Sequence, residues 1–218
     1  MTADDPTRAL DDQVAGCAQA HQRLLGFLDE LVEQGQVRST DLSLLPGWTI
    51  GHVLTHLARN ADGFRNMIEG AAAGEIRSMY VSREQRDIDI EAGASRPLAT
   101  IVGDCRAATW ALESSWARLT MDAWHGFGTT RTGPTAIIEL PWRRWREVEV
   151  HHADLGLAFT PEDWSAAFVA AGLADAREEW RGRATALPDE VASASDRQQL
   201  ARLLGRPSGL STPAPSWG

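Results

Sequence analysis

The sequence predicts a mainly α-helical protein, a four-helix bundle with crossover connections and a small C-terminal appendage. Four long segments repeat apolar residues every three or four positions, which is the period of a helix. The connections between several of these segments are long, and stretches with strand-like character are few. We expect residues 1–160 to form the bundle and residues 161–218 to form a helix, a short helix and a tail.

Local signals set the ends of the four long helices. Gly35 suits the end of the first helix, and Thr49 can cap the second through its hydroxyl. Pro141 suits the first turn of the fourth, where its missing N–H costs nothing. The helices are predicted at residues 6–35, 49–70, 97–119 and 141–155.

The connections inside the bundle differ in character. Residues 75–96 are polar and irregular, which predicts a long loop with some helical turns, and long loops often carry function. Residues 120–139 are rich in glycine and predict a connector, with one short extended piece at residues 136–138.

The C-terminal third is less strongly patterned. A fifth helix is predicted at residues 161–182, and residues 184–186 could form a second short extended piece. Three leucines predict one short helix near residues 200–204. Residues 211–216 have the composition of a tail.

Composition narrows the function classes. The chain has 218 residues and a net charge of -9, which disfavours binding to nucleic acid because phosphate backbones would repel it. Its two cysteines cannot build a disulfide framework, and both lie in apolar helical patterns typical of buried, inert thiols. We see neither a leader nor an apolar run of membrane-spanning length, so we expect a cytoplasmic protein.

A carboxylate and an imidazole form the most informative pair in the sequence. Glu147 and His151 are four residues apart, so a helix places them on one face, one turn apart. The pair would supply two ligands of a His₂Glu zinc site, although the same spacing suits a plain surface hydrogen bond. The third ligand could be His52 or His56, which share a face of the second predicted helix.

The neighbours of the pair suggest supporting roles. His152 points about 100° away from His151 on a helix and is a poorer ligand candidate. Asp154 follows His151 by three residues and could orient its ring. Two imidazoles and a carboxylate would suit zinc, and also nickel, cobalt or iron(II).

Three arginines precede or flank Glu147 on the fourth predicted helix. Arg144 lies three residues before Glu147, on roughly the same face, and Arg143 and Arg146 lie beside it. An arginine near a buried metal could hold a substrate carboxylate through two parallel hydrogen bonds. The alternative is a solvated basic face.

Three motifs give the chain a resemblance to a known family, the mycothiol-dependent maleylpyruvate isomerases, within the wider DinB-like group of metal-dependent thiol transferases. The resemblance covers about residues 5–185. The motifs are Leu45-Pro46-Gly47-Trp48-Thr49 followed by Thr55-His56-Leu57-Ala58-Arg59-Asn60-Ala61; Arg144, Arg146-Glu147-Val148, His151 and Asp154-Leu155-Gly156; and Met79-Tyr80-Val81-Ser82 followed by Arg86.

The resemblance implies a fold, a metal site and a reaction. The fold would be a DinB-like helical bundle, and one zinc would be held by His56, Glu147 and His151, with mycothiol as the thiol cofactor. The implied reaction is the cis–trans isomerisation of maleylpyruvate to fumarylpyruvate in gentisate degradation. Zinc would make the thiolate available at neutral pH, and that thiolate would add to the cis double bond.

The anionic substrate needs local cations in an acidic protein. We expect Arg86 and Arg144 to act on the diacid, and Arg206 to join them through a loose resemblance to a late arginine-containing turn of the family. Arg146 and Asn60 are our candidates for contacts with mycothiol. The family carries a second α/β domain after the bundle, so the resemblance implies that the C-terminal region here, with about 35 residues after the fifth helix, is reduced.

Two other functions stay open on the sequence. A mycothiol-dependent S-transferase would share the metal site but act on another electrophile, and a helical binding module would retain no chemistry. The expected partners are a small diacid and a low-molecular-weight thiol, without nucleic acid or membrane. The sequence does not indicate an oligomeric state.

Overall fold

The computed structural model describes residues 6–181 and 187–211, and the chain forms two compact units. The first unit spans Met1–Leu155 and the second Gly156–Gly218. The first unit holds the four long helices, so the predicted mainly helical bundle is confirmed.

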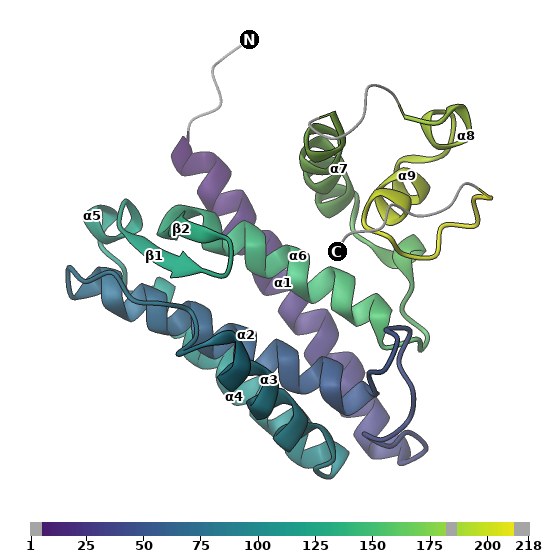
Figure 1. Ribbon diagram of the computed structural model, residues 1–218, viewed down its shortest axis with the longest axis horizontal. Helices are drawn as coiled ribbons and strands as arrows, with labels where there is room; N and C mark the ends of the chain where they lie inside the picture. The colour runs from purple at the N-terminus through teal and green to yellow at the C-terminus, as the bar shows by residue number, and fades with distance from the viewer. Residues whose placement is uncertain (1–5, 182–186, 212–218) are drawn as a thin grey trace. The chain divides into compact units, whose positions relative to one another are not determined.

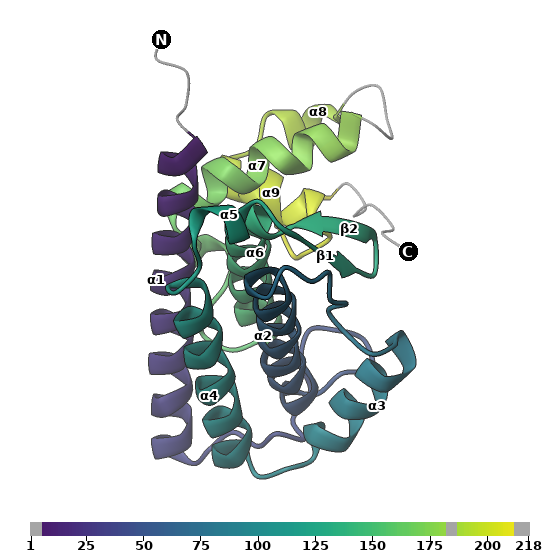
Figure 2. The ribbon, with the colours of Figure 1, turned by 90° about the vertical axis from the view of Figure 1, so that its left-hand side faces the viewer.

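Four long helices close the first unit into a bundle, which Figures 1 and 2 show from two sides. They are α1 (Pro6–Gln34), α2 (Ile50–Ala72), α4 (Leu98–Trp116) and α6 (Leu140–Asp154). Helix α1 packs against α4 and α6, and α2 packs against the same two helices. The predicted helix ends lie within a few residues of those observed. This arrangement brings α2 and α6 side by side.

The bundle core is made of the apolar faces that the periodicity predicted. Leu24, Leu28, Leu54, Leu57, Ile101, Leu112 and Val148 are among its buried members. A Cβ atom at Gly16 would lie 2.4 Å from the ring of Trp145, so this glycine lets α1 approach α6 closely. Cys17 and Cys105 are both buried, as predicted. Within the described residues, no helix has the length and apolar character needed to cross a membrane.

The segment between α2 and α4 is more ordered than the predicted loop. It contains α3 (Arg83–Ala94), whose N-terminus is capped by the hydroxyl of Ser82, which accepts from the backbone N–H of Gln85. The helix packs against α2. A Cβ atom at Gly51 would lie 1.9 Å from the backbone oxygen of Ala94, so the contact is closely fitted.

The connector before α6 forms a small hairpin. Helix α5 (Met121–Trp124) is followed by β1 (Phe127–Thr130) and β2 (Gly133–Ala136), which pair antiparallel. The predicted extended piece at residues 136–138 was wrong beyond its first residue, because Ile137–Glu139 forms the 3-10 turn η1 that leads into α6. Gly133, with a φ of 116°, permits the turn between the strands.

The second unit is a small helical assembly. It consists of η2 (Pro161–Asp163), α7 (Ala166–Arg181), α8 (Asp189–Ala192) and α9 (Asp196–Leu203), and α7 packs against α9. Helix α9 matches the predicted short helix.

The fifth helix starts later than predicted. Residues 161–163 form a separate 3-10 turn, closed by Thr160, whose N–H donates to Asp163 at 2.8 Å. Trp164 is extended, and the Ser165 hydroxyl accepts from Phe168 N–H at the start of α7. The predicted end of this helix at residue 182, the extended piece at 184–186 and the tail from residue 212 lie outside the described residues.

Candidate metal centre

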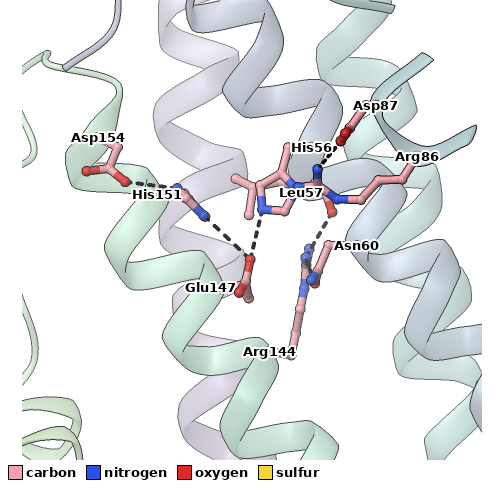
Figure 3. Close-up of polar contacts among 9 residues, drawn as sticks. All are labelled: His56, Leu57, Asn60, Arg86, Asp87, Arg144, Glu147, His151 and Asp154. Atoms are coloured by element: carbon pink, nitrogen blue, oxygen red, sulfur yellow. Dashed lines mark hydrogen bonds and ion pairs between the residues drawn. The ribbon is translucent and has the colours of Figure 1, made fainter. Parts of the chain in front are cut away.

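Three side chains from α2 and α6 meet between the two helices, as Figure 3 shows. The Nε2 atom of His56 lies 2.9 Å from Oε2 of Glu147, and Nε2 of His151 lies 3.5 Å from the same oxygen. One donor atom from each residue lies within 4.8 Å of the other two, so the three could hold a metal ion.

Helix geometry explains why these three meet. Glu147 and His151 project from adjacent turns of α6, and His56 faces them from α2. The side chains of His56 and His151 are 8% and 14% exposed, whereas that of Glu147 is 34% exposed. The triad is therefore enclosed on the helix side and open on the Glu147 side, as a site that admits a ligand must be.

A second carboxylate orients His151. Its Nδ1–H donates to Oδ2 of Asp154 at 2.9 Å, so Nε2 is the ring atom aimed at Glu147. Burial lowers the pKa of His151, but its hydrogen bonds to Asp154 and Glu147 outweigh that effect and raise it to about 9. Metal-binding histidines commonly carry such a carboxylate partner, and the predicted orienting position of Asp154 is the one observed.

The same balance of burial and hydrogen bonding acts on the other two ligand candidates. Burial raises the pKa of Glu147, but hydrogen bonds from His151 and His56 outweigh it and hold that pKa well below its ordinary value. Burial lowers the pKa of His56 to about 4 against the opposing hydrogen bond of Glu147. An ionised carboxylate and a neutral imidazole are the forms that bind divalent metals.

Arg86, from α3, completes the surroundings of His56. Its Nη2 lies 3.1 Å from Nδ1 of His56, and its Nη1 donates to Asp87. A guanidinium can only donate, so Nδ1 accepts and Nε2 carries the proton donated to Glu147. Coordination through Nε2 would move that proton to Nδ1 and take away this acceptor from Arg86.

The donor set fits a divalent metal. Two imidazole nitrogens and one carboxylate oxygen, with a fourth direction open, are the ligands of many catalytic zinc sites. Each group can reach its binding form without rearranging the helices, because the three atoms already point at one another.

The two rival histidines are engaged elsewhere. His52 is the third residue of α2, where its Nδ1 accepts from Thr49 N–H at 3.1 Å in a capping box, and its Nε2 lies 3.1 Å from Glu91. His152 is buried against the ring of Phe27, with ring centroids 5.0 Å apart. The choice of His56 over His52 thus follows from the capping role of His52.

Arg144 and Asn60 lie in the bundle interior and contact each other. Arg144 is 1% exposed, and its Nη1 donates to Oδ1 of Asn60 at 2.8 Å and to the backbone oxygen of Leu57 at 2.9 Å (Figure 3). Its Nε donates to Nε2 of His21 at 3.0 Å, and the other nitrogen of that ring lies 2.7 Å from Glu113. The roles predicted for Arg144 and Asn60 towards ligands stay predictions.

The remaining predicted residues lie in different places. Arg146 is partly exposed on α6, one residue from Glu147. Arg206 belongs to the second unit, where its Nη1 donates to the backbone oxygen of Leu204 at 2.7 Å. Their predicted roles also stay predictions.

Two aromatic residues near the triad received no role from the sequence. Trp48 places its ring centroid 5.7 Å from that of His56 in an edge contact. The ring of Tyr80 lies 5.8 Å from the guanidinium carbon of Arg86. Both belong to motifs that carried the resemblance, but no spacing rule connects a loop residue to a site formed by two other helices.

Comparison with known proteins identifies a family that matches the part of the chain holding this site. Residues 17–156 match the family described as "Mycothiol maleylpyruvate isomerase N-terminal domain". No curated protein of similar sequence was found.

Two solved structures share the fold. A crystal structure of the mycothiol-dependent maleylpyruvate isomerase is 24% identical, with a TM-score of 0.82, over 95% of this chain and 97% of that chain. A crystal structure of a histidine-to-alanine mutant of the mycothiol-dependent maleylpyruvate isomerase is 25% identical, with a TM-score of 0.84 and the same coverage. Because the family match covers well over half of the 218 residues, this chain belongs to the family of the mycothiol maleylpyruvate isomerase N-terminal domain.

Proposed function

We propose that this protein is a metal- and thiol-dependent cis–trans isomerase that converts maleylpyruvate to fumarylpyruvate in gentisate degradation, with zinc and mycothiol as its cofactors. The observation that carries the proposal is the His56, Glu147 and His151 triad, open on one side, in a chain of this family. A divalent metal held there would lower the pKa of a bound thiol and so supply a thiolate at neutral pH.

The protein's own groups prepare the ligands. Asp154 holds one proton of His151 on Nδ1, so a metal that binds this ring would displace the proton on Nε2. Glu147 is held ionised by its two histidine neighbours and adds negative charge that offsets that of a divalent ion.

Arg86 is the first candidate for binding a substrate carboxylate. The side chain of Arg86 is 23% exposed, and its guanidinium lies beside His56. That guanidinium would lose its acceptor there if His56 coordinated a metal through Nε2. A substrate carboxylate would then be its natural partner. We propose that Arg146 contacts the thiol, while the buried Arg144 and Asn60 would act on the site by fixing α6 against α2.

The test is an absorbance assay of maleylpyruvate with metal-loaded protein, with and without mycothiol. We expect the conversion to fumarylpyruvate to require both protein and thiol, and the thiol concentration to stay constant, since isomerisation returns it. Absence of a thiol-dependent change would refute the proposal. Loss of one thiol per substrate would instead identify an S-transferase.

A further inference from the structure

The segment that carries Tyr80 is fixed to the bundle and hairpin. Met79 N–H donates to the backbone oxygen of Thr129 at 2.8 Å, and Thr129 N–H donates to that of Arg77 at 3.0 Å. Nδ2 of Asn66, on α2, donates to the backbone oxygen of Ser78 at 2.8 Å. The residues before Tyr80 therefore run along the edge of β1 and over α2 as an anchored extended segment, with one parallel bridge between Ser78 and Thr129.

Glycines on α2 make room for this segment. A Cβ atom at Gly63 would lie 2.6 Å from the side chain of Met79 and 2.8 Å from its backbone oxygen. A Cβ atom at Gly70 would lie 2.7 Å from the side chain of Arg77. Such close backbone contact restricts the motion of the segment, so the position of Tyr80 is set by the fold.

Tyr80 is linked to the triad through Arg86. The guanidinium lies over the tyrosine ring, with its carbon 5.8 Å from the ring centroid. The same arginine reaches Nδ1 of His56 at 3.1 Å. Through this shared arginine, Tyr80 and His56 lie on either side of one guanidinium.

The phenol is a hydrogen-bond donor at neutral pH. Burial raises its pKa, and this effect outweighs the opposing charge of Arg86. A neutral phenol can donate its O–H hydrogen to an acceptor on a bound molecule. Tyr80 is partly exposed, so a bound molecule can reach it.

We propose that the Tyr80 hydroxyl is a catalytic donor, which with Arg86 stabilises the enolate oxygen formed when a thiolate adds to the substrate. The inference rests on the proposed function. As the S–C bond forms, the π electron pair of the double bond moves onto the conjugated ketone oxygen. The former double bond rotates as a single bond. The electron pair then returns, the double bond re-forms and the S–C bond breaks, without net gain of a proton or an electron.

Two fixed donors aimed at a developing oxyanion stabilise the transition state more than the ground state. The loss of one such donor costs on the order of 100-fold in kcat in other enzymes. Tyr80→Phe removes the hydroxyl but keeps the ring stacked on Arg86, so it isolates the hydrogen bond.

The kinetic test compares Tyr80→Phe with wild type and with His125→Ala, a replacement at an exposed position just after α5. We expect kcat of metal-loaded Tyr80→Phe to fall on the order of 100-fold. Metal content, melting temperature and KM should stay near those of the wild type. A wild-type kcat in Tyr80→Phe would overturn the inference while the proposed function stood. A thiol-independent or inactive wild type would overturn both.

A second readout does not depend on turnover. Tyr80 is the one tyrosine among the 218 residues, so 3-fluorotyrosine labelling gives a single fluorine resonance. We expect this resonance to shift when fumarylpyruvate is added to metal-loaded protein, and the shift to shrink in Arg86→Ala. A resonance that does not respond to fumarylpyruvate would overturn the contact.

Discussion

Replacement of Arg144 by methionine tests the buried network that joins α6 to α2. Arg144 donates to Nε2 of His21, to Oδ1 of Asn60 and to the backbone oxygen of Leu57. Leu57 lies inside α2 and keeps its helical partner, so the two side-chain acceptors dominate the loss. Each buried acceptor left unpaired costs about 1–3 kcal/mol.

The expected net loss is smaller than the sum of these terms. Methionine also relieves the cost of burying a guanidinium, and burial already lowers the pKa of Arg144. We therefore expect the free energy of unfolding to fall by about 3 kcal/mol. Metal affinity should weaken too, because Arg144 lies one turn from Glu147 on α6.

The assay is urea unfolding of the metal-free protein at neutral pH, with Arg143→Met as the matched control. Arg143 lies next along α6, is 41% exposed and pairs with Glu139 at 2.9 Å, so its replacement should change stability by less than about 1 kcal/mol. Equal stability of Arg144→Met and Arg143→Met would refute the positioning role. A raised KM for the diacid in a fully stable Arg144→Met variant would support the predicted contact with substrate.

Three further outcomes are expected. Arg86→Ala should keep or raise the metal affinity measured by calorimetry, since it removes a donor from Nδ1 of His56, the atom that must carry the proton when Nε2 binds metal. A tenfold loss of metal affinity, about 1.4 kcal/mol, would contradict this. Burial lowers the pKa of His21 to about 4 in the folded protein. As the pH falls from 6.5 to 4, the unfolded chain therefore takes up a proton at this residue that the folded chain does not, and the free energy of unfolding should fall by up to about 3 kcal/mol. His21→Gln should flatten that slope in urea titrations, and an unchanged slope would argue against it. Gly51→Ala should lower the melting temperature, because its Cβ would lie 1.9 Å from a backbone oxygen of α3. Gly26→Ala, in open space on α1, should not lower it. Equal melting temperatures of the two variants would contradict the close fit at Gly51.

The long bundle helices were the part of the fold that the sequence predicted well. The four bundle helices carry strong apolar periodicity, and Thr49 and Pro141 mark two of their starts. Helix α3 escaped prediction because most of its residues face solvent and only a few apolar side chains are buried. The hairpin was not predicted because β2 contains Pro134, and a proline, which lacks a backbone N–H, argues against a strand.

The ligand candidates that share one helix were predictable from their spacing, whereas the ligand contributed by a second helix was not. Glu147 and His151 follow from the spacing on α6, whereas spacing alone left His52 and His56 as equal candidates. The capping box of Thr49 and His52 could have separated them, since a histidine at the third position can accept from the cap's N–H. The pairing of His21 with Glu113 joins residues 92 positions apart and has no local signal.

The most direct test of the central claim is the metal content of purified protein and its ligand variants. We expect one divalent ion per chain in the wild type and in His52→Ala, and loss of that ion in His56→Ala and Glu147→Gln with their helical content retained. Full metal retention in His56→Ala, or loss of the ion in His52→Ala alone, would contradict a centre built from α2 and α6 through His56.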